Sequence, residues 1–267
     1  MRLDKFLAEC NQGTRSEVKV LLKSKRVTVN GVTENSGKRQ INEFSDVVCL
    51  DEKKLTYQSF VYYMLNKPKD VITATEDSVQ KTVLDLIDKK DRIKGLFPVG
   101  RLDKDTTGLV LLTNDGALAH NLLAPKKHVE KVYEAKIEGI VTEAEVELFS
   151  KPIELKNGEV TKPSRLVVRK ADEDAGMSEI EITISEGKYH QIKRMFASTG
   201  MHVLELKRLK MGSLELDDRL DPGKYRALTQ TGLKNLKSET DKKTTVNLAV
   251  VFCSQNQYVF KNMNEVS

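Results

Sequence analysis

Residues 97–116 read Phe97-Pro-Val-Gly-Arg-Leu-Asp-Lys-Asp-Thr-Thr-Gly-Leu-Val-Leu-Leu-Thr-Asn-Asp-Gly116 and combine a polar turn with an apolar strand. The run Leu109–Thr113 is a short apolar segment of the kind that forms a buried strand. Asn114-Asp-Gly116 is a turn signal at its end. Asp103 and Asp105 come before the strand, so the stretch predicts two carboxylates on a turn between strands.

The residues of this turn allow two interpretations. Asp103-x-Asp105-x-Thr107 matches the DxDxT loop of haloacid-dehalogenase-type phosphatases, in which the first aspartate is a nucleophile beside Mg²⁺. That loop should directly follow a strongly apolar strand, whereas Gly100-Arg101-Leu102 intervenes here. The alternative is an ordinary surface turn, because Asp, Thr and Gly are common turn residues.

The chain around this stretch mixes short strands with helical patterns and has no internal repeat. We expect strands at 60–65 and 179–185 and helices at 78–88, 116–124, 142–150 and 189–199. Because these segments lack regular βαβ spacing, they predict an α+β fold with a mainly antiparallel mixed sheet flanked by helices.

The N-terminal residues predict a separate small module. Helices are expected at 3–9 and at 17–25, the second capped by Ser16, followed by a hairpin with the turn Asn30-Gly31 and a strand at 47–50. The polar residues 51–54 are the expected linker.

The positive charge of the chain is concentrated at its N-terminus. Residues 1–39 contain nine Lys or Arg against four Asp or Glu, whereas residues 60–231 contain 28 of each sign. A basic module beside a neutral body predicts binding to a polyanion, although solvated helix faces also carry such an excess.

Several classes of function have no motif support. The four histidines show no metal-ligand spacing, and no GxxxxGK[ST], GxGxxG or GxSxG sequence occurs. No run approaches the roughly 18 apolar residues of a membrane-spanning helix, and the N-terminus has no signal-peptide core. We therefore expect a cytoplasmic protein, and the motifs give no support to metal or nucleotide binding.

Four stretches, in order, resemble the motifs of the pseudouridine synthases of the small-subunit ribosomal RNA branch, the RsuA type. They are Leu65-Asn-Lys-Pro68, Gly100-Arg-Leu-Asp-Lys-Asp-Thr-Thr-Gly-Leu109, Glu130-Lys-Val-Tyr133 and Ser185-Glu-Gly-Lys-Tyr-His-Gln-Ile-Lys-Arg-Met-Phe196. Val160-Thr-Lys-Pro163 and Leu220-Asp-Pro-Gly-Lys-Tyr-Arg226 also fit that branch, and the N-terminal module resembles its S4 RNA-binding domain. The resemblance covers about residues 1–230.

The resemblance implies that uridine within RNA is isomerised to pseudouridine without a cofactor. It places the catalytic carboxylate at Asp103, the cation that faces it at Lys193, where many relatives have Arg, and the aromatic that stacks on the target uracil at Tyr133. Asp105 is expected to be structural. Further substrate contacts are expected from Arg101, Lys67, His190 and Gln191.

The resemblance also implies the organisation of the chain and its partner. An S4-like domain would span residues 1–58, the catalytic domain residues 60–231, and a loosely ordered tail residues 232–267. The expected substrate is 16S ribosomal RNA in an assembling small subunit, at a target of the pseudouridine-516 type, and the protein would be a monomer. A large-subunit (23S) synthase and a catalytically silent ribosome-assembly factor remain alternatives. The RNA contacts of the S4-like module are expected from Arg2, Arg15, Lys19, Lys23, Lys25 and Arg26.

Overall fold

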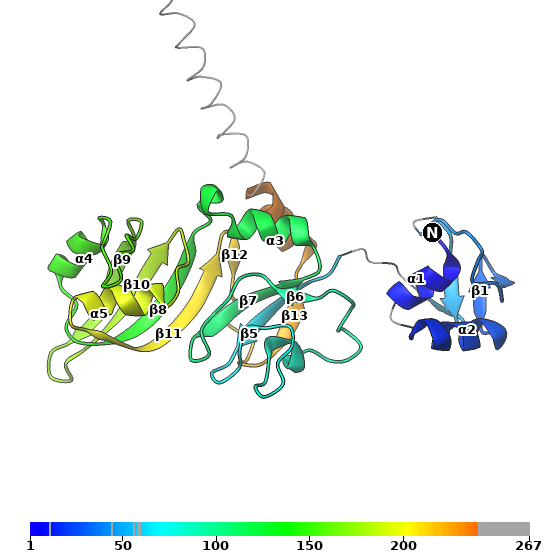
Figure 1. Cartoon of the computed structure of the whole chain (residues 1–267), viewed down its shortest axis with the longest axis horizontal. Helices are drawn as coiled ribbons and strands as arrows, with labels where there is room; N and C mark the ends of the chain where they lie inside the picture. Colours follow the sequence, from blue (N-terminus) through cyan, green and yellow to red (C-terminus); the bar gives the residue numbers. More distant parts are fainter. Residues whose placement is uncertain (11, 44, 56, 58–59, 240–267) are drawn as a thin grey trace, which may run out of the picture. The chain divides into compact units, whose positions relative to one another are not determined.

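The computed structural model describes residues 1–10, 12–43, 45–55, 57 and 60–239 (Figure 1). Contacts between residues divide the chain into two units. The first contains Met1–Val61 together with Ile87–Leu96, and the second contains Tyr62–Leu86 and the described residues from Phe97 on. The domain ranges 1–58 and 60–231 stay predictions.

The N-terminal unit packs two helices on a small antiparallel sheet. The helices are α1 (Leu3–Glu9) and α2 (Arg15–Lys23), whose apolar sides meet the buried faces of the strands around Phe6, Val18 and Val29. The strands are β1 (Val27–Val29), β2 (Val32–Thr33), β3 (Val48–Leu50) and β4 (Lys53–Lys54), in the order β2-β1-β3-β4. Asn30 and Gly31 have φ of 52° and 81°, the left-handed pair that a tight hairpin turn requires.

Two details of this unit differ from the sequence expectations. The cap of α2 is Thr14 and not Ser16, because Thr14 and Glu17 form a reciprocal capping box one turn apart. The expected linker at 51–54 is instead a second hairpin, in which Asp51 and Glu52 adopt φ of 48° and 66° and lead into β4. Polar composition marks both linkers and tight turns, so the sequence alone did not separate them.

The second unit is built on one long twisted sheet, and the predicted α+β fold with a mainly antiparallel mixed sheet is confirmed. Its main path runs β13-β5-β7-β11-β8-β10-β9, with β12 paired to β11 and β6 to β7. Only the β7–β11 pair among these strands is parallel. The strands are β5 (Tyr62–Lys67), β6 (Phe97–Pro98), β7 (Thr107–Thr113), β8 (Lys131–Glu138), β9 (Arg165–Asp172), β10 (Met177–Ile184), β11 (His202–Met211), β12 (Leu214–Glu215) and β13 (Tyr225–Ala227).

Gly108 allows the parallel pair to form. Its φ is 98°, and a Cβ at this position would lie against the carbonyl oxygen of Arg208 and 2.8 Å from its backbone nitrogen. Only a residue without a side chain lets β7 and β11 approach this closely. The glycine therefore joins the half of the sheet that carries Asp103 to the half that carries Tyr133.

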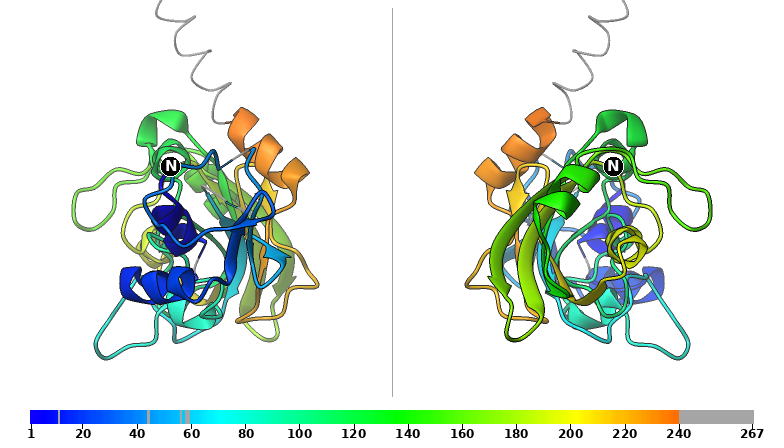
Figure 2. Two further views of the ribbon diagram at one scale, coloured as in Figure 1. Left: turned by 90° about the vertical axis from the view of Figure 1, so that its right-hand side faces the viewer. Right: turned by 90° about the vertical axis from the view of Figure 1, so that its left-hand side faces the viewer.

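Helices cover the sheet at both ends. Near β9 and β11 lie α4 (Glu143–Phe149) and α5 (Gln191–Ser198) (Figures 1 and 2). These two helices pack together through Phe149 and Phe196, whose ring centroids are 4.9 Å apart. At the other end, α3 (Gly116–Leu123) packs on a core that includes Leu109 and Met211. Two short 3₁₀ turns, η1 (Val83–Leu86) and η2 (Pro125–Lys127), lie in the connections.

Two expected elements are different in the structure. The helix expected at 78–88 is reduced to η1, because the Asp77 and Asp85 carboxylates accept backbone N–H groups of this segment and stabilise turns. The first residues of the expected tail are ordered: a helix covers residues 230–239, and Leu236 is completely buried beside α3. The remainder of the expected tail, residues 240–267, lies outside the described residues. Within the described part of the chain, no helix is both long and apolar enough to cross a membrane.

Candidate active site

Asp103 lies on the loop that joins β6 to β7, and backbone hydrogen bonds hold this loop in place. Thr73 binds the loop at Leu102, the residue before the aspartate. Its hydroxyl donates to the Leu102 carbonyl at 2.9 Å and accepts a hydrogen bond from the Leu102 N–H at 3.1 Å. The Thr106 N–H donates to the Asp103 carbonyl at 3.1 Å and closes the turn. The carboxylate is thus presented from a fixed backbone.

Lys67 lies beneath this loop and does not reach the surface. Its side chain is fully buried, and its Nζ donates to the carbonyls of Pro68, Lys104 and Thr106 at 3.1, 3.1 and 2.8 Å. Burial lowers the pKa of Lys67 to about 8, although Asp105 and Asp103 nearby oppose the fall. The predicted RNA contact of Lys67 stays a prediction, and the burial of this side chain argues against it. Its ammonium group instead donates hydrogen bonds to carbonyls of the loop that carries Asp103 and so holds this loop in position.

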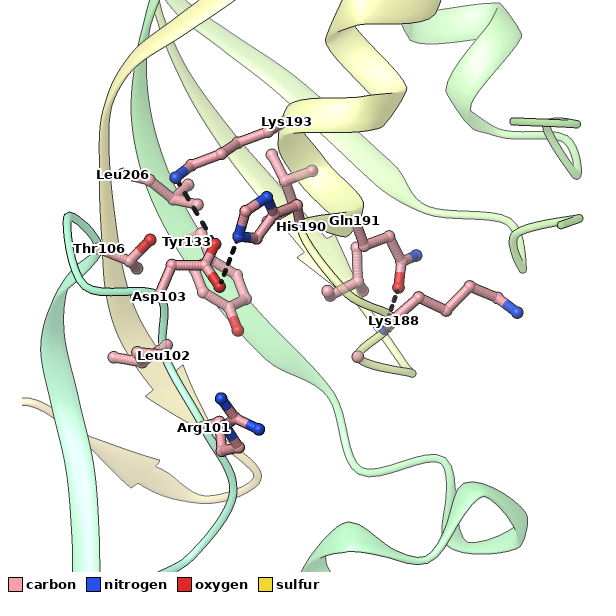
Figure 3. Close-up of a pocket in the computed structure, with 13 residues that line it drawn as sticks. Arg101, Leu102, Asp103, Thr106, Tyr133, Lys188, His190, Gln191, Lys193 and Leu206 are labelled. Atoms are coloured by element: carbon pink, nitrogen blue, oxygen red, sulfur yellow. Dashed lines mark hydrogen bonds and ion pairs between the residues drawn. The ribbon is translucent and has the colours of Figure 1, made fainter. Parts of the chain in front are cut away.

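The start of α5 brings two basic side chains to Asp103 (Figure 3). His190 Nε2 is 3.5 Å from one carboxylate oxygen, and Lys193 Nζ is 3.6 Å from the other. His190 precedes α5 with φ of 47°, a left-handed conformation that turns its ring toward the loop. His190 and Lys193, which are 87 and 90 positions from Asp103 in the sequence, therefore face it across the site.

Lys193 is shared between two carboxylates. It donates to both oxygens of Asp105, at 2.6 and 2.7 Å, which is closer than its approach to Asp103. Burial disfavours the Asp105 carboxylate, but the hydrogen bond and charge of Lys193 outweigh this and hold the pKa of Asp105 below its ordinary value. Lys193, the cation expected beside Asp103, thus lies next to that carboxylate, while its shorter hydrogen bonds go to Asp105.

The pocket in front of Asp103 has one aromatic wall. Tyr133 lies on β8, is 7% exposed, and its ring stands beside the carboxylate (Figure 3). Leu102, Ile184 and Leu206 add apolar surface, while exposed Arg101 lies at the mouth. The hydroxyl of Thr106, also in the lining, is buried without a hydrogen-bond partner. An aromatic wall next to an acid and a base suits a flat polar ring such as a nucleobase.

Gln191 supports the wall of the pocket rather than offering a free amide. Its Nε2 donates to Glu186 at 2.9 Å and lies 3.9 Å from Met195 Sδ, and its Oε1 accepts the Lys188 N–H at 3.0 Å. The side chain is 4% exposed. These hydrogen bonds brace the loop 186–190, and the predicted substrate contact of Gln191 stays a prediction.

Comparisons with known proteins agree with this geometry. The sequence model of a family described as RNA pseudouridylate synthase matches residues 61–198, which include Asp103, Tyr133 and Lys193. The chain belongs to this family. The phosphatase interpretation of Asp103-x-Asp105 is thereby wrong, because the synthase family accounts for the whole segment. The model of the S4 domain matches residues 1–48.

Alignments with individual relatives extend over most of this chain. A Bacillus subtilis (strain 168) protein named uncharacterized RNA pseudouridine synthase YtzG is 42% identical over 87% of this chain and 97% of its own. The ribosomal small subunit pseudouridine synthase A of Escherichia coli (strain K12) is 40% identical over 86% of this chain and 97% of its own. A crystal structure of a pseudouridylate synthase superposes with a TM-score of 0.61 at 37% identity, over 88% of this chain and 99% of that one.

The basic residues expected to bind RNA lie on the surface of the synthase's S4 domain. Arg15, Lys19 and Lys23 lie along α2, and Lys25 follows its end; all four are exposed. Two further members of the set are engaged within the domain. Arg2 forms a bidentate salt bridge with Asp4, and Arg26 forms one with Asp51. The α2 side chains are therefore the stronger candidates for phosphate contacts.

The structure adds synthase residues that the sequence did not single out. Thr73 is one, since its bonds to Leu102 cross 29 positions and leave no local pattern. Glu159 is another, whose carboxylate accepts Arg194 Nη1 at 2.6 Å behind the site. Within the described residues, no three His, Cys, Asp or Glu side chains converge as metal ligands would.

Proposed function

We propose that this synthase converts one uridine of 16S ribosomal RNA to pseudouridine with Asp103 as its catalytic carboxylate and without a cofactor. It acts as a monomer in the cytoplasm, on RNA of the assembling small subunit. The observation that carries the proposal is Asp103 itself, held on a rigid loop between two basic groups and beside Tyr133. The names of relatives that act on the small ribosomal subunit support this choice of RNA.

The reaction rearranges the nucleotide and leaves its mass unchanged. The N1–C1′ bond breaks, the uracil rotates, and C5 bonds to C1′; the proton on C5 is lost while N1 gains one. Asp103 starts the reaction as a carboxylate, either by attack at C1′ or by removing the proton at C2′. Both routes need a negative group fixed beside the sugar, which the loop between β6 and β7 provides.

The neighbours of Asp103 have separate tasks. Lys193 supplies positive charge close to the carboxylate, and Asp105 keeps the lysine in place. The Tyr133 ring stacks on the uracil while the glycosidic bond is broken. Arg101, at the mouth of the pocket, contacts the sugar-phosphate backbone on either side of the flipped nucleotide.

A uridine in a base-paired helix cannot reach Asp103, so it must leave its stack and enter the pocket. The S4 domain contributes affinity through Arg15, Lys19 and Lys23, whose exposed cations pair with phosphates without reading bases. The shape of the RNA and its single-stranded elements then select the site.

The test maps pseudouridine in 16S and 23S ribosomal RNA by carbodiimide-stopped reverse transcription. The samples come from a strain lacking the gene, complemented with the parent protein, Asp103→Asn or Asp174→Asn. Asp174 is an exposed residue of the turn between β9 and β10, so its variant makes the same chemical change away from the pocket. We expect one 16S stop that the parent and Asp174→Asn restore and Asp103→Asn does not.

Three other results of this mapping experiment would contradict parts of the proposal. A restored stop in 23S RNA would reassign the substrate to the large subunit. Full restoration by Asp103→Asn would remove the catalytic role of that carboxylate. If no stop depended on the gene, the chain would be an RNA-binding assembly factor.

A further inference from the structure

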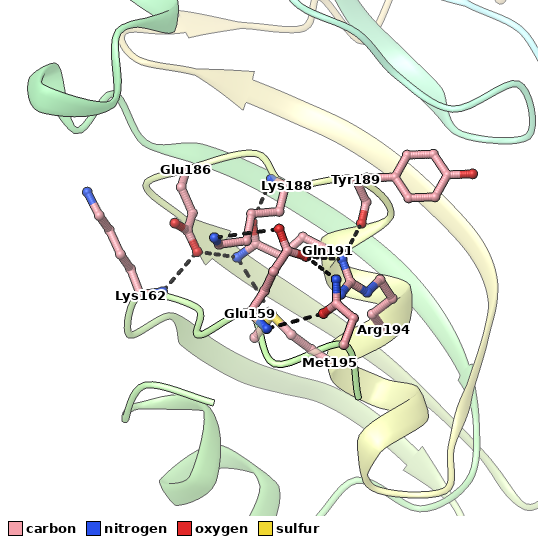
Figure 4. Close-up of polar contacts among 9 residues, drawn as sticks. Glu159, Lys162, Glu186, Lys188, Tyr189, Gln191, Arg194 and Met195 are labelled. Carbon is pink, nitrogen blue, oxygen red and sulfur yellow. Dashed lines mark hydrogen bonds and ion pairs between the residues drawn. The ribbon is translucent and has the colours of Figure 1, made fainter. Parts of the chain in front are cut away.

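Tyr189 is an aromatic residue that the folded protein leaves in solvent beside the active site. Its side chain is 75% exposed, and its ring projects away from the polar residues around it (Figure 4). One face of the ring is covered by His190, with centroids 3.8 Å apart and planes at 18°. The other face has no role in the core, although aromatic side chains usually bury most of their surface.

The backbone under Tyr189 is held from several sides. Its carbonyl accepts Arg194 Nη1 at 3.2 Å, and the same guanidinium is bound by Glu159 and Asn157 (Figure 4). Glu186 on the preceding turn accepts the Lys162 N–H at 2.8 Å as well as Gln191 Nε2. This network lies behind the loop, so it fixes the ring's base and leaves the outer face open.

The position of the ring relates it to the target nucleotide. His190, on which it stacks, has its Nε2 3.5 Å from the Asp103 carboxylate. A flat group stacked on the outer face of Tyr189 would thus lie outside the pocket, separated by one ring from the histidine that faces Asp103. Lys188 and exposed Arg101 line the pocket next to which Tyr189 stands, and Lys188 Nζ is also 4.0 Å from the Glu159 carboxylate.

We propose that Tyr189, backed by His190, is a stacking platform for the unpaired base of a nucleotide adjacent to the target uridine. Exposed aromatic rings next to cations are the surfaces on which single-stranded RNA bases stack, and every base has a face to offer. The platform holds the neighbour in place while the target base turns inside the pocket. The assignment rests on the proposed function, since it presumes that uridine in RNA enters the pocket.

The first experiment separates binding from chemistry. Single-turnover pseudouridine formation is followed by tritium release from 16S RNA transcripts carrying [5-³H]uridine, with the parent, Tyr189→Ala, Tyr189→Phe and Leu148→Ala. Leu148 is an exposed apolar residue of α4, a helix that does not line the pocket. For Tyr189→Ala we expect the half-saturating enzyme concentration to rise about tenfold, the scale of one base–aromatic stack, with the limiting rate within about twofold. Tyr189→Phe and Leu148→Ala should match the parent.

The second experiment identifies the base. Synthetic RNAs that contain the mapped uridine carry an abasic nucleotide at one flanking position at a time, and their binding to the parent and to Tyr189→Ala is compared. At one position the abasic RNA should bind the parent about tenfold more weakly and Tyr189→Ala no more weakly than the intact RNA.

Two results would overturn the platform while leaving the proposed function intact. One is an unchanged half-saturating concentration for Tyr189→Ala, which would leave the ring free for a protein partner. The other is a fall in the limiting rate alone, which would mean that Tyr189 acts by holding His190. If the parent itself forms no pseudouridine, the proposed function fails first and the platform falls with it.

Discussion

Replacing Lys67 by methionine would remove the ammonium group under the loop that carries Asp103 while nearly preserving the volume of the side chain. Three carbonyls, from Pro68, Lys104 and Thr106, would lose their donor in a site with no access to water. Two of these carbonyls lie on either side of Asp105 and within three residues of Asp103. The substitution therefore tests whether Lys67 positions the loop or contacts RNA.

The expected loss of stability follows from two opposing quantities. Hydrogen bonds from a charged donor contribute about 1.5–3 kcal/mol each, or about 4.5–9 kcal/mol for three. Burial lowers the pKa of Lys67 from 10.5 to about 8, and this fall corresponds to roughly 3 kcal/mol against the buried charge. We expect Lys67→Met to lower the free energy of unfolding by about 3 kcal/mol, within what a domain of this size tolerates.

The same substitution should slow catalysis more than it weakens binding. A shift of the loop by about 1 Å is enough to reduce kcat about 100-fold, because the carboxylate must meet the sugar in one geometry. The Kd for 16S RNA should stay within about twofold of the parent, since the ammonium group is enclosed by protein. Urea unfolding, single-turnover tritium release and filter binding measure the three quantities.

Lys69→Met is the matched control, because it makes the same change two residues further on at an exposed position. Its unfolding free energy should equal that of the parent within about 0.5 kcal/mol. If Lys67→Met instead raised the Kd for RNA about tenfold and left stability and kcat unchanged, Lys67 would be an RNA contact and the reasoning would be refuted.

The pH dependence of stability gives an independent check on Lys67. Its pKa of about 8 in the folded protein lies below the ordinary 10.5, so the unfolded chain binds more protons between these values. The free energy of unfolding of the parent must then rise relative to Lys67→Met as the pH increases from about 8 to about 10.5. Urea titrations of both proteins at several pH values measure this difference, and a difference that stays constant would contradict the burial of a charged amine.

Three further predictions concern the sheet, the S4 domain and the acidic pair. Gly108→Ala should destabilise the synthase by at least about 3 kcal/mol in urea unfolding, because a Cβ would collide with the backbone of Arg208; an unchanged midpoint would contradict the tight parallel pair. Lys19→Glu with Lys23→Glu should weaken RNA binding and reduce the slope of log Kd against log salt by about 1.5, with the thermal midpoint preserved; an unchanged slope would remove both lysines from the interface. The lowered pKa of Asp105 means that its contribution to stability is present above the ordinary value and is lost as the pH falls through the folded pKa, so the parent should lose stability in acid faster than Asp105→Asn. Parallel acid-unfolding curves for the two proteins would contradict the ion pair.

The sequence predicted many of the secondary-structure elements from motifs and local chemistry. The strand of Leu109–Thr113 lies within β7, and the hairpin at Asn30-Gly31 forms with both residues left-handed, because apolar runs and turn residues act through neighbouring atoms. The prediction of a helix at 78–88 was wrong, also for a local reason. Aspartate side chains accept backbone N–H groups that a helix would use, and the sequence pattern does not show this competition clearly. The order of the helix at residues 230–239 was missed because Leu236 is buried only against distant elements.

The family and its S4 domain were determined by the sequence, since they depend on which residues occur and in what order. The tertiary structure decided what each side chain does. It turned Lys67 from a surface contact into a buried anchor, gave Lys193 a closer partner in Asp105, and left Tyr189 in solvent. The physical reason is that burial, charge pairing and exposure depend on atoms brought together from distant segments, 88 residues apart for Lys193 and Asp105, and no spacing within a motif records those distances.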